Sequence, residues 1–252
     1  MLKRIIPLFL LSGKRLVKGT NFSNYIDTGD PLSQAKIYDA QGADEIIILD
    51  INANREERLI DKEILKKIAS ACRLPVSAGG GIKSVKDARE LFLSGADRIV
   101  INTQAVINPL LVRELAEEFG SQAIIISIDV KKQKEDKYQI YILSGKIPSE
   151  VDLFKHIETC LKMGAGEIML TSIDREGTLS GFDIELYKTV KERLDVPMIA
   201  SGGAGNYEHI VQLFETVNCE ACAIGKMLFL RDYDIVRIKS YLTGRYIKVR
   251  QA

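Results

Sequence analysis

The stretch GAGEIMLTSIDREGTLSGFD, residues 164–183, decides the fold because the chain contains a second version of it. Its compact apolar run, Ile168 to Leu170, is bounded by turn residues and predicts a buried strand. Subtracting 122 from each number leads to GADEIIILDINANREERLID, residues 42–61, where glycine, alanine, glutamate and isoleucine recur in register. The same offset relates Gly80-Gly81 to Gly202-Gly203, without a gap over about forty residues. The chain is therefore predicted to be an internal duplication.

Each half also contains shorter repeats. GADRI, residues 95–99, matches GADEI, residues 42–46. Repeated strand–loop–helix units of roughly 25 to 40 residues imply parallel strands joined by crossover helices. Eight such units close into a barrel, for which about 250 residues is the usual length. We therefore expect an α/β chain with a single (β/α)8 TIM barrel over residues 1–252, built from duplicated half-barrels at about 1–120 and 121–252.

Composition is ordinary for a globular domain, with 46% apolar and 27% charged residues. A formal net charge of +1 favours neither nucleic acid nor an anionic membrane as a partner. The N-terminal MLKRIIPLFLLSGKR is superficially signal-like, but its apolar run is short and a basic stretch follows. A first barrel strand is the better interpretation. No apolar stretch approaches the roughly 20 residues of a membrane span, so no membrane is expected as a partner.

The cysteines at positions 219 and 222 have CxxC spacing but lead into an apolar strand. Residues three apart on a strand point to opposite faces, so a structural role is favoured over a metal or redox role. With Cys72 and Cys160, they indicate a reduced, cytosolic protein. We expect neither a metal nor a cofactor.

The expected barrel strands are residues 4–10, 45–51, 75–78, 98–102, 123–129, 168–172, 198–201 and 221–225. The polar stretch 12–30 predicts a long functional loop, ended by Asp30 as a helix begins. Asp61 and Ser84 are expected to cap later helices. Alternating apolar residues within 131–146 predict a small hairpin on the top face of the barrel.

Two glycine-rich turns are candidates for anion binding. The active site of such a barrel lies at the C-terminal ends of its strands. Glycine lets backbone N–H groups approach an anion there, and a following helix adds a favourable dipole. One site combines Gly79-Gly80-Gly81 with Asn102-Thr103; its duplicate combines Gly202-Gly203 with Ile224-Gly225. A single glycine-rich turn is explained equally well by a tight reversal of the chain and by anion binding. Two such turns related by the repeat predict a ligand with a phosphate at each end.

A carboxylate is expected at the barrel mouth. Asp129 ends the fifth strand, and catalysis is favoured there over a helix cap or a fold anchor. Superposing the first strand on the fifth aligns Ile5 with Ile124 and places Leu10 opposite Asp129. A site with two acid–base carboxyls would have an acid at that place, and this chain has a leucine.

Four charged residues stand at the starts of barrel strands, where a simple core would be apolar. They are Arg4, Glu45, Arg98 and Glu167. Because Glu45 maps to Glu167 in the repeat, we expect a nearly twofold ring of salt bridges closing the barrel floor. Such a ring is either a plug that satisfies the strand ends or a gate for a small molecule.

Over its full length the chain resembles the HisF family, the cyclase subunits of imidazole glycerol phosphate synthase. The resemblance is carried by KRIIP, LVKGTNF, GDP, GADE, LDI, GGGI, INT, FGSQA, SIDVK, ILSGK, GAGEI, LTSIDREGT, SGFD, IASGGAGN and EH. Members of this family are duplicated half-barrels that receive ammonia from a glutaminase docked on the barrel floor. The ammonia passes a charged gate and travels through the interior to the top face.

The resemblance implies roles for individual residues. The four floor charges correspond to the gate, with Arg98 where the family commonly has lysine. Asp129 corresponds to the second catalytic aspartate, and Lys18 to a loop lysine that contacts substrate. The implied substrate and phosphate positions are Asp50, Gly80, Gly81, Asn102, Thr103, Thr171, Asp174, Gly177, Gly202, Gly203 and Gly225. The implied partners are a HisH-like glutaminase subunit on the floor and a phosphorylated small-molecule ligand.

The departures from the family pattern bear on function. Leu10 replaces the first catalytic aspartate, which should weaken cyclisation by about 10²–10⁴-fold. Gly225 replaces the usual serine of the second phosphate site, and Lys226 follows where the family has an apolar residue. In this the chain is similar to HisF paralogues of surface-polysaccharide and flagellin-glycan pathways. Those paralogues act with a HisH-like glutaminase and a sugar amidotransferase to convert acetamido into acetamidino groups.

Two hypotheses follow. The chain is an ammonia-conducting barrel that serves an acetamidino-sugar amidotransferase, or it is a genuine cyclase-lyase of histidine biosynthesis. Leu10 favours the first, and the intact glycine turns favour the second. A phosphosugar barrel without an ammonia role would leave the four floor charges unexplained.

Overall fold

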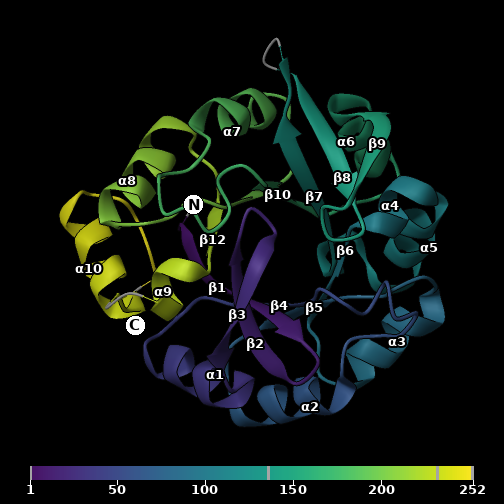
Figure 1. Ribbon diagram of the computed structural model, residues 1–252, viewed down its shortest axis with the longest axis horizontal. Coiled ribbons are helices and arrows are strands. Elements are labelled where there is room, and N and C mark those ends of the chain that lie inside the picture. The colour runs from purple at the N-terminus through teal and green to yellow at the C-terminus, as the bar shows by residue number, and fades with distance from the viewer. Residues whose placement is uncertain (1, 135–136, 231–232, 251–252) are drawn as a thin grey trace.

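Eight parallel strands close into a barrel surrounded by helices (Figure 1). The computed structural model describes residues 2–134, 137–230 and 233–250. The barrel strands are β1 (Arg4–Ser12), β4 (Ile46–Asp50), β5 (Val76–Gly79), β6 (Arg98–Ile101), β7 (Ile124–Lys132), β10 (Glu167–Ser172), β11 (Met198–Ser201) and β12 (Ala221–Ile224). Pairing of β7 with β10 and of β1 with β12 completes the closure. The predicted TIM barrel is confirmed, and each strand boundary lies within three residues of its expected place.

Helices follow the barrel strands around the outside. They are α1 (Pro31–Ala40), α2 (Lys62–Ala71), α3 (Val85–Leu93), α4 (Thr103–Ile107), α5 (Leu110–Phe119), α6 (Leu153–Lys162), α7 (Ile184–Lys191), α8 (Tyr207–Thr216), α9 (Lys226–Leu230) and α10 (Ile235–Gly244), with a short 3₁₀ turn at Ser121–Ala123. The predicted caps Asp61 and Ser84 are confirmed, and Asp30 caps a helix as well: their side chains accept backbone N–H groups of α2, α3 and α1. Such caps satisfy donors that a helix leaves unpaired at its start. No helix among the described residues is long and apolar enough to cross a membrane.

Residues 12–30 form a β-hairpin, so the prediction of a long irregular loop is wrong. β2 (Arg15–Thr20) pairs antiparallel with the end of β1 and with β3 (Ser23–Gly29). The reversal occurs at Gly13, whose φ of +59° is accessible to glycine at little cost. Leu16 and Val17 are buried, which anchors the hairpin although most of its sequence is polar.

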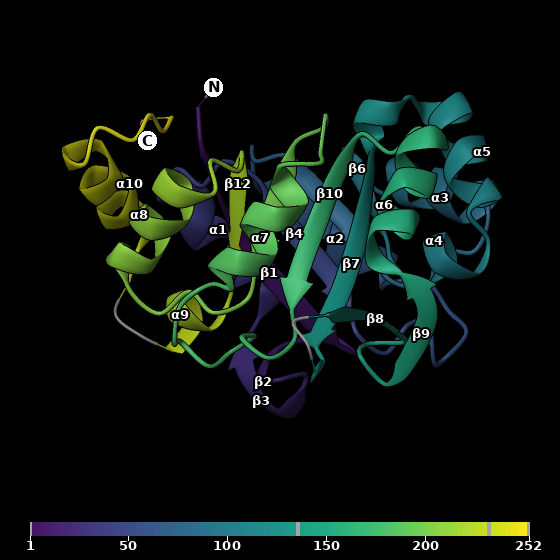
Figure 2. The same cartoon turned by 90° about the horizontal axis from the view of Figure 1, so that it is seen from above.

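The predicted hairpin after the fifth barrel strand is confirmed, and it is the counterpart of β2–β3 in the duplication. β8 (Tyr138–Ile142) pairs antiparallel with β7, and β9 (Ile147–Asp152) pairs with β8. One hairpin therefore follows the first barrel strand and the other follows the fifth. Both project from the same end of the barrel, while the chain termini lie at the opposite end (Figure 2).

Candidate functional site

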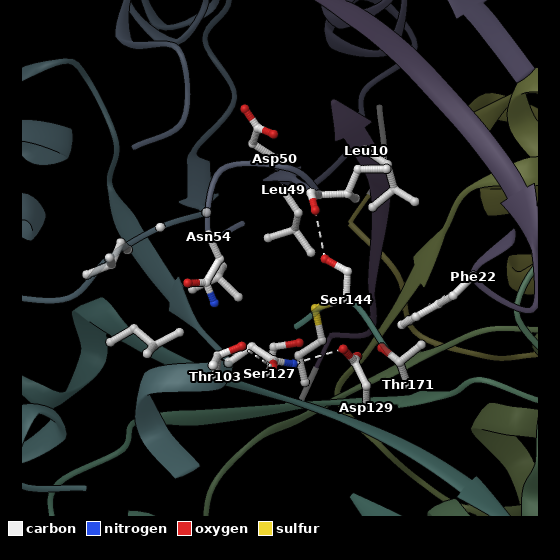
Figure 3. A pocket seen from close by; sticks show the side chains of 18 of the residues that line it. Leu10, Phe22, Leu49, Asp50, Asn54, Thr103, Ser127, Asp129, Ser144 and Thr171 are labelled. Atoms are coloured by element: carbon white, nitrogen blue, oxygen red, sulfur yellow. Dashed lines mark hydrogen bonds between the residues drawn. The ribbon is translucent and has the colours of Figure 1, made fainter. Parts of the chain in front are cut away.

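A cavity of about 120 Å³ opens at the C-terminal ends of the strands, beneath the two hairpins. Its walls come from both halves of the barrel and include Phe22 and Tyr25 of β2–β3 and Ser144 of β8–β9. Leu8, Leu10, Leu49, Val100 and Met169 form an apolar base, which continues into the packed interior of the barrel. Figure 3 shows side chains from these elements converging on one space.

Asp129 is the carboxyl group expected at this mouth, and it lines the cavity. The amide Nδ2 of Asn102 donates to its Oδ2 at 2.9 Å, and Thr171 also hydrogen-bonds to it. Burial raises the pKa of Asp129 to about 7, although these hydrogen bonds oppose the shift. A carboxyl group with that pKa is suited to exchanging a proton near neutral pH.

Leu10 lies on another wall of the same cavity (Figure 3). The superposition of the first strand on the fifth therefore predicted correctly that position 10 lies in the same cavity as Asp129. A leucine there turns one side of the mouth apolar and leaves that wall without a proton-transfer group.

A second carboxyl group reaches the cavity from a place that the sequence analysis missed. Glu176, in the loop after β10, is buried, lines the cavity and interacts electrostatically with Asp129. Burial raises the pKa of Glu176, while the ammonium of Lys18 opposes this shift. Subtracting 122 leads to Asn54, which lines the cavity as well. Both residues lie within the repeated stretches 164–183 and 42–61, so comparing these two loops would have found both side chains.

The first glycine turn lies where it was expected. Gly80, Gly81, Asn102 and Thr103 all line the cavity. Hairpin β8–β9 contacts this rim, since the N–H of Leu143 donates to Thr103 Oγ1 at 3.1 Å and the hydroxyl of Ser144 donates to the carbonyl of Ile51 at 2.8 Å.

The second glycine turn repeats this backbone but is not part of the cavity wall. A Cβ on Gly80 would lie 3.0 Å from the carbonyl oxygen of Asp50, and one on Gly202 would lie 2.9 Å from that of Ser172. Asp50 and Ser172 are themselves related by the repeat, so the geometry of the turns is duplicated. None of the predicted positions Asp174, Gly177, Gly202, Gly203 and Gly225 is among the residues that line the cavity.

Lys18 also lies outside the cavity wall. It is buried on β2, its ammonium donates to the carbonyl oxygen of Leu8, and it lies 5.2 Å from the ring centre of Phe229. Burial lowers the pKa of Lys18 to about 8, and the neighbouring Glu176 opposes that shift. Lys18 is not among the residues that line the cavity, and its contact with substrate stays a prediction.

Two of the predicted acidic ligands are already engaged by the protein. Asp50 accepts the N–H groups of Asn52 and Ala53 and pairs with Arg58 at 2.6 Å. In Figure 3 its carboxylate points away from the centre of the cavity. Asp174 accepts the backbone N–H of Lys132 at 2.7 Å. Both carboxylates therefore organise loops in this structure.

The four floor charges form the predicted ring of ion pairs. Arg4 pairs with Glu45 at 2.9 Å and also with Glu167, and Arg98 contacts the same two glutamates. Both glutamates are buried, and Ser77 donates a further hydrogen bond to Glu45. Burial raises the pKa of Glu45, an effect opposed chiefly by Arg98. The geometry is confirmed, and the role of the ring as a gate stays a prediction.

The cysteines show no arrangement for metal or redox chemistry. All four are free thiols, and burial raises the pKa of Cys160 and of Cys219 to about 12. Within residues 2–134, 137–230 and 233–250, no group of His, Cys, Asp and Glu side chains is placed to hold a metal ion.

Known proteins of one family are similar to this chain over nearly its full length. The profile of the histidine biosynthesis protein family matches residues 4–234. The chain is 42% identical over 248 residues to the imidazole glycerol phosphate synthase subunit HisF of Chlorobium limicola, covering 98% of each chain. It is 38% identical to that of Streptococcus mutans, covering 98% of this chain and 99% of the relative, and 40% identical to that of Bacillus cereus, covering 98% of each. The chain therefore belongs to the histidine biosynthesis protein family, as a HisF-type subunit of imidazole glycerol phosphate synthase.

Proposed function

We propose that this chain is the ammonia-receiving subunit of a glutamine amidotransferase complex and that its ammonia serves the formation of an acetamidino sugar. A HisH-like glutaminase would dock on the barrel floor, and a sugar amidotransferase would take up ammonia at the mouth. The observation that carries the proposal is the position of Leu10. It lies in the wall of the cavity that holds Asp129, where the paired acid of a cyclase would stand.

The route for ammonia would run along the barrel axis. It would begin at the ring of Arg4, Glu45, Arg98 and Glu167 and continue through the apolar interior. An apolar interior disfavours the charged ammonium ion. The molecule that would pass through it is ammonia, which is small and uncharged. Buried ion pairs are seldom better for stability than packed apolar side chains, so a ring of four charges supports a role beyond plugging the floor.

A genuine cyclase is the second candidate, and Glu176 is the observation that favours it. This carboxyl group shares the cavity with Asp129, and the first glycine turn offers a place for a phosphate. In that case Glu176 would supply the proton transfer that Leu10 does not.

The two candidates differ in a direct assay. The purified chain is supplied with an ammonium salt and the bisphosphorylated ribosyl aminoimidazole carboxamide substrate. We expect Leu10→Asp to exceed the wild-type chain in cyclisation by about 10²–10⁴-fold, the usual contribution of a general acid–base group. Leu10→Asn is the matched control, because it has the size of aspartate but transfers no proton.

Equal turnover of the wild-type chain and Leu10→Asp would contradict the proposal. The cyclase alternative then requires that Glu176→Gln reduces this turnover by about 10²-fold or more. Production of an acetamidino sugar when the wild-type chain is combined with a HisH-like glutaminase and the sugar amidotransferase would support the proposal directly.

A further inference from the structure

A buried ion pair lies beside the ring of four charges on the barrel floor but is not a member of it. Lys239 of α10 and Asp44, which lies just before β4, have their Nζ and Oδ1 atoms 2.8 Å apart. Their side chains are 2% and 4% exposed, and the Lys239 ammonium also donates to the carbonyl oxygen of Gly42 at 2.6 Å. Burying two charges is costly, and such a pair is often no more stabilising than packed apolar side chains. A role besides stability is therefore worth seeking.

Asp44 is adjacent to two members of the floor ring. It directly precedes Glu45 in the chain. Its Oδ2 accepts the backbone N–H of Ile5 at 2.8 Å, and its own N–H donates to the carbonyl oxygen of Ile5 at 3.2 Å. Because Ile5 directly follows Arg4, these two bonds fix the backbone beside that arginine. Arg4 and Glu45 are in turn paired with each other at 2.9 Å.

The C-terminal segment of the chain also fixes the other side of Arg4. The N–H of Lys3 donates to the carbonyl oxygen of Lys248 at 2.8 Å, and Lys3 forms a parallel β-bridge with Val249. Figure 2 shows α10 near the end of the barrel where both chain termini lie. The residue before Arg4 is thus held directly by residues 248–249, and the residue after it is held through Asp44 by Lys239.

The repeat places no carboxylate at the equivalent position of the second half. It relates Asp44 to Gly166, and the strand superposition relates Ile5 to Ile124. The backbone bond recurs, since the N–H of Gly166 donates to the carbonyl oxygen of Ile124 at 3.1 Å. The N–H of Ile124 donates to the carbonyl oxygen of Ser121 instead of to a carboxylate. The barrel therefore closes at this place without an acidic side chain.

This difference between the halves coincides with the floor ring. The strand superposition places Ala123 opposite Arg4, so the second half has no ring arginine at this position. A Cβ at Gly166 would lie 2.0 Å from the carbonyl oxygen of Ser121, which leaves no room for a side chain. The buried carboxylate is present beside the strand that carries a ring arginine and absent beside the strand that does not.

We propose that Asp44 and Lys239 are positioning residues, which hold the Arg4 side chain in the ring geometry that ammonia must pass. The inference rests on the proposed function, in which ammonia enters through the floor ring. Lys239 fixes the carboxylate of Asp44, and this carboxylate fixes the backbone next to Arg4. The guanidinium can then contact both buried glutamates of the ring.

The first test is the NMR signal of the Arg4 Nε–H group in the full-length, ¹⁵N-labelled chain, assigned by its loss in Arg4→Lys. The variants are Lys239→Met, which keeps an unbranched side chain without the charge, and Asp44→Ala, which removes the carboxylate that the second half lacks. We expect one sharp Arg4 signal in the wild-type chain. In both variants this signal should shift or broaden, because the arginine exchanges between several positions.

The second test is nitrogen transfer by the chain in complex with a HisH-like glutaminase and the sugar amidotransferase. Misplacing a group by about 1 Å from a distant position can reduce a rate by about 10²-fold. We expect product formation from glutamine to fall by about tenfold in both variants, while formation from ammonium salt stays within about twofold of the wild-type rate. Glutamine hydrolysis should continue.

Lys191→Met is the matched control. Lys191 pairs with Glu220 at 2.8 Å, and the carboxylate of Glu220 accepts the N–H of Met198 at 2.8 Å, so the same chemistry joins β11 to β12. Neither of these strands carries a member of the floor ring. The carbonyl oxygen of Glu220 accepts the N–H of Arg4 at 3.0 Å, and this backbone bond does not involve the Lys191 side chain.

The double variant Lys239→Met/Asp44→Leu covers the case in which a single variant does not fold. It leaves no unpaired buried charge, and replacing both members of a buried pair by apolar side chains is often neutral for stability. We expect it to show the same change in the Arg4 signal and the same selective loss of glutamine-driven product.

The outcomes separate the inference from the proposed function. An unchanged Arg4 signal in the folded variants, an equal fall with both ammonia sources, or the same losses in Lys191→Met would each overturn the inference. A changed Arg4 signal with a selective loss of glutamine-driven product, absent from the control, would support it. A wild-type complex that forms no acetamidino sugar would contradict the proposed function, and the Arg4 signal would then decide the positioning by itself.

Discussion

The two rims of the barrel mouth have the same backbone and different access. On the first rim, hairpin β8–β9 touches the edge through Leu143 and Ser144, and the cavity stays open beside Gly80 and Gly81. On the second rim, Asn21 at the tip of hairpin β2–β3 is hydrogen-bonded to the loop after β10, and Gly202 and Gly203 are buried. The repeat therefore explains the shared backbone of the two turns, and the packing around each turn decides how exposed it is.

The hairpins also contact each other's halves in a reciprocal way. Ser144 donates to the carbonyl of Ile51, and Asn21 donates to that of Ile173, which is Ile51 shifted by the repeat. Phe22 packs at Gly145, where an added Cβ would be 2.5 Å from its ring. Because each hairpin reaches across the barrel, a change in one alters the environment of the opposite half.

The largest effect is expected where the two rims are most alike. A Cβ at position 81 would lie 1.8 Å from the carbonyl oxygen of Arg58, and one at position 203 would lie 2.1 Å from that of Gly181. Both glycines also have positive φ. We expect Gly81→Val and Gly203→Val each to lower the free energy of unfolding by about 4 kcal/mol or more in urea titrations. Gly13→Ala, which has positive φ but open space, should cost only about 1 kcal/mol. Full stability in either valine variant would contradict the close packing of that rim.

Asp129 should make stability depend on pH in a way that has no counterpart at Leu10. Its pKa rises from an ordinary value of 3.8 to about 7 in the folded chain. Below pH 3.8 the Asp129 carboxyl group is protonated in both the folded and the unfolded chain. Between pH 3.8 and pH 7 the unfolded chain loses this proton, whereas the folded chain keeps it. Stability therefore falls with rising pH across this window, by about 4 kcal/mol in total, and is level above it.

Asp129→Asn should remove this contribution and still accept the hydrogen bond from Asn102. The measurement is the difference in unfolding free energy between the two chains from pH 4 to pH 8. Glu176, whose pKa is also raised by burial, contributes a fall of its own to both chains. Parallel curves for the two chains would show that Asp129 does not carry the shift.

The barrel floor offers a comparison in which the two halves should respond alike. Glu45 and Glu167 are repeat equivalents, and each contacts both Arg4 and Arg98. We expect Glu45→Leu and Glu167→Leu each to lower unfolding stability by about 3 kcal/mol, because both arginines lose a buried partner.

If the ring is a gate, Glu167→Leu has a second consequence. The barrel should still fold and bind its glutaminase, and glutamine hydrolysis should continue. Product formation driven by glutamine should fall, while formation driven by ammonium salt survives. An equal loss of product formation with both ammonia sources would identify the ring as a structural plug, because the lower stability expected of this variant occurs in either case.

The smallest effects are expected at the hairpin tips. Ser144→Ala removes one hydrogen bond and should cost about 1 kcal/mol, whereas Asn21→Ala removes two and should cost about 2 kcal/mol. Hydrogen exchange of the hairpin amides would report the loss locally. Faster exchange confined to β2–β3 in Asn21→Ala would sharpen the contrast between the rims, and equal exchange in both hairpins would remove it.

Much of the site was predictable, and the reasons are specific. Asp129, Leu10 and the first glycine turn followed from aligning one half with the other. Glu176 was missed because its loop has no regular sequence pattern. The repeat nevertheless relates Glu176 to Asn54, which also lines the cavity. The hairpin at residues 12–30 was missed because only Leu16 and Val17 show that it is anchored in the core.

The sequence by itself determined the duplication, the closed barrel, the helix caps and the charged floor. These features depend on residues that repeat at a fixed offset or lie next to one another in the chain. Only the tertiary structure decided that Lys18 lies against Gly225 and that Gly202 and Gly203 are buried while Gly80 and Gly81 are partly exposed. The physical reason is the distance in sequence. Asn21 meets a carbonyl 152 residues away, and no periodicity within either half specifies such a contact.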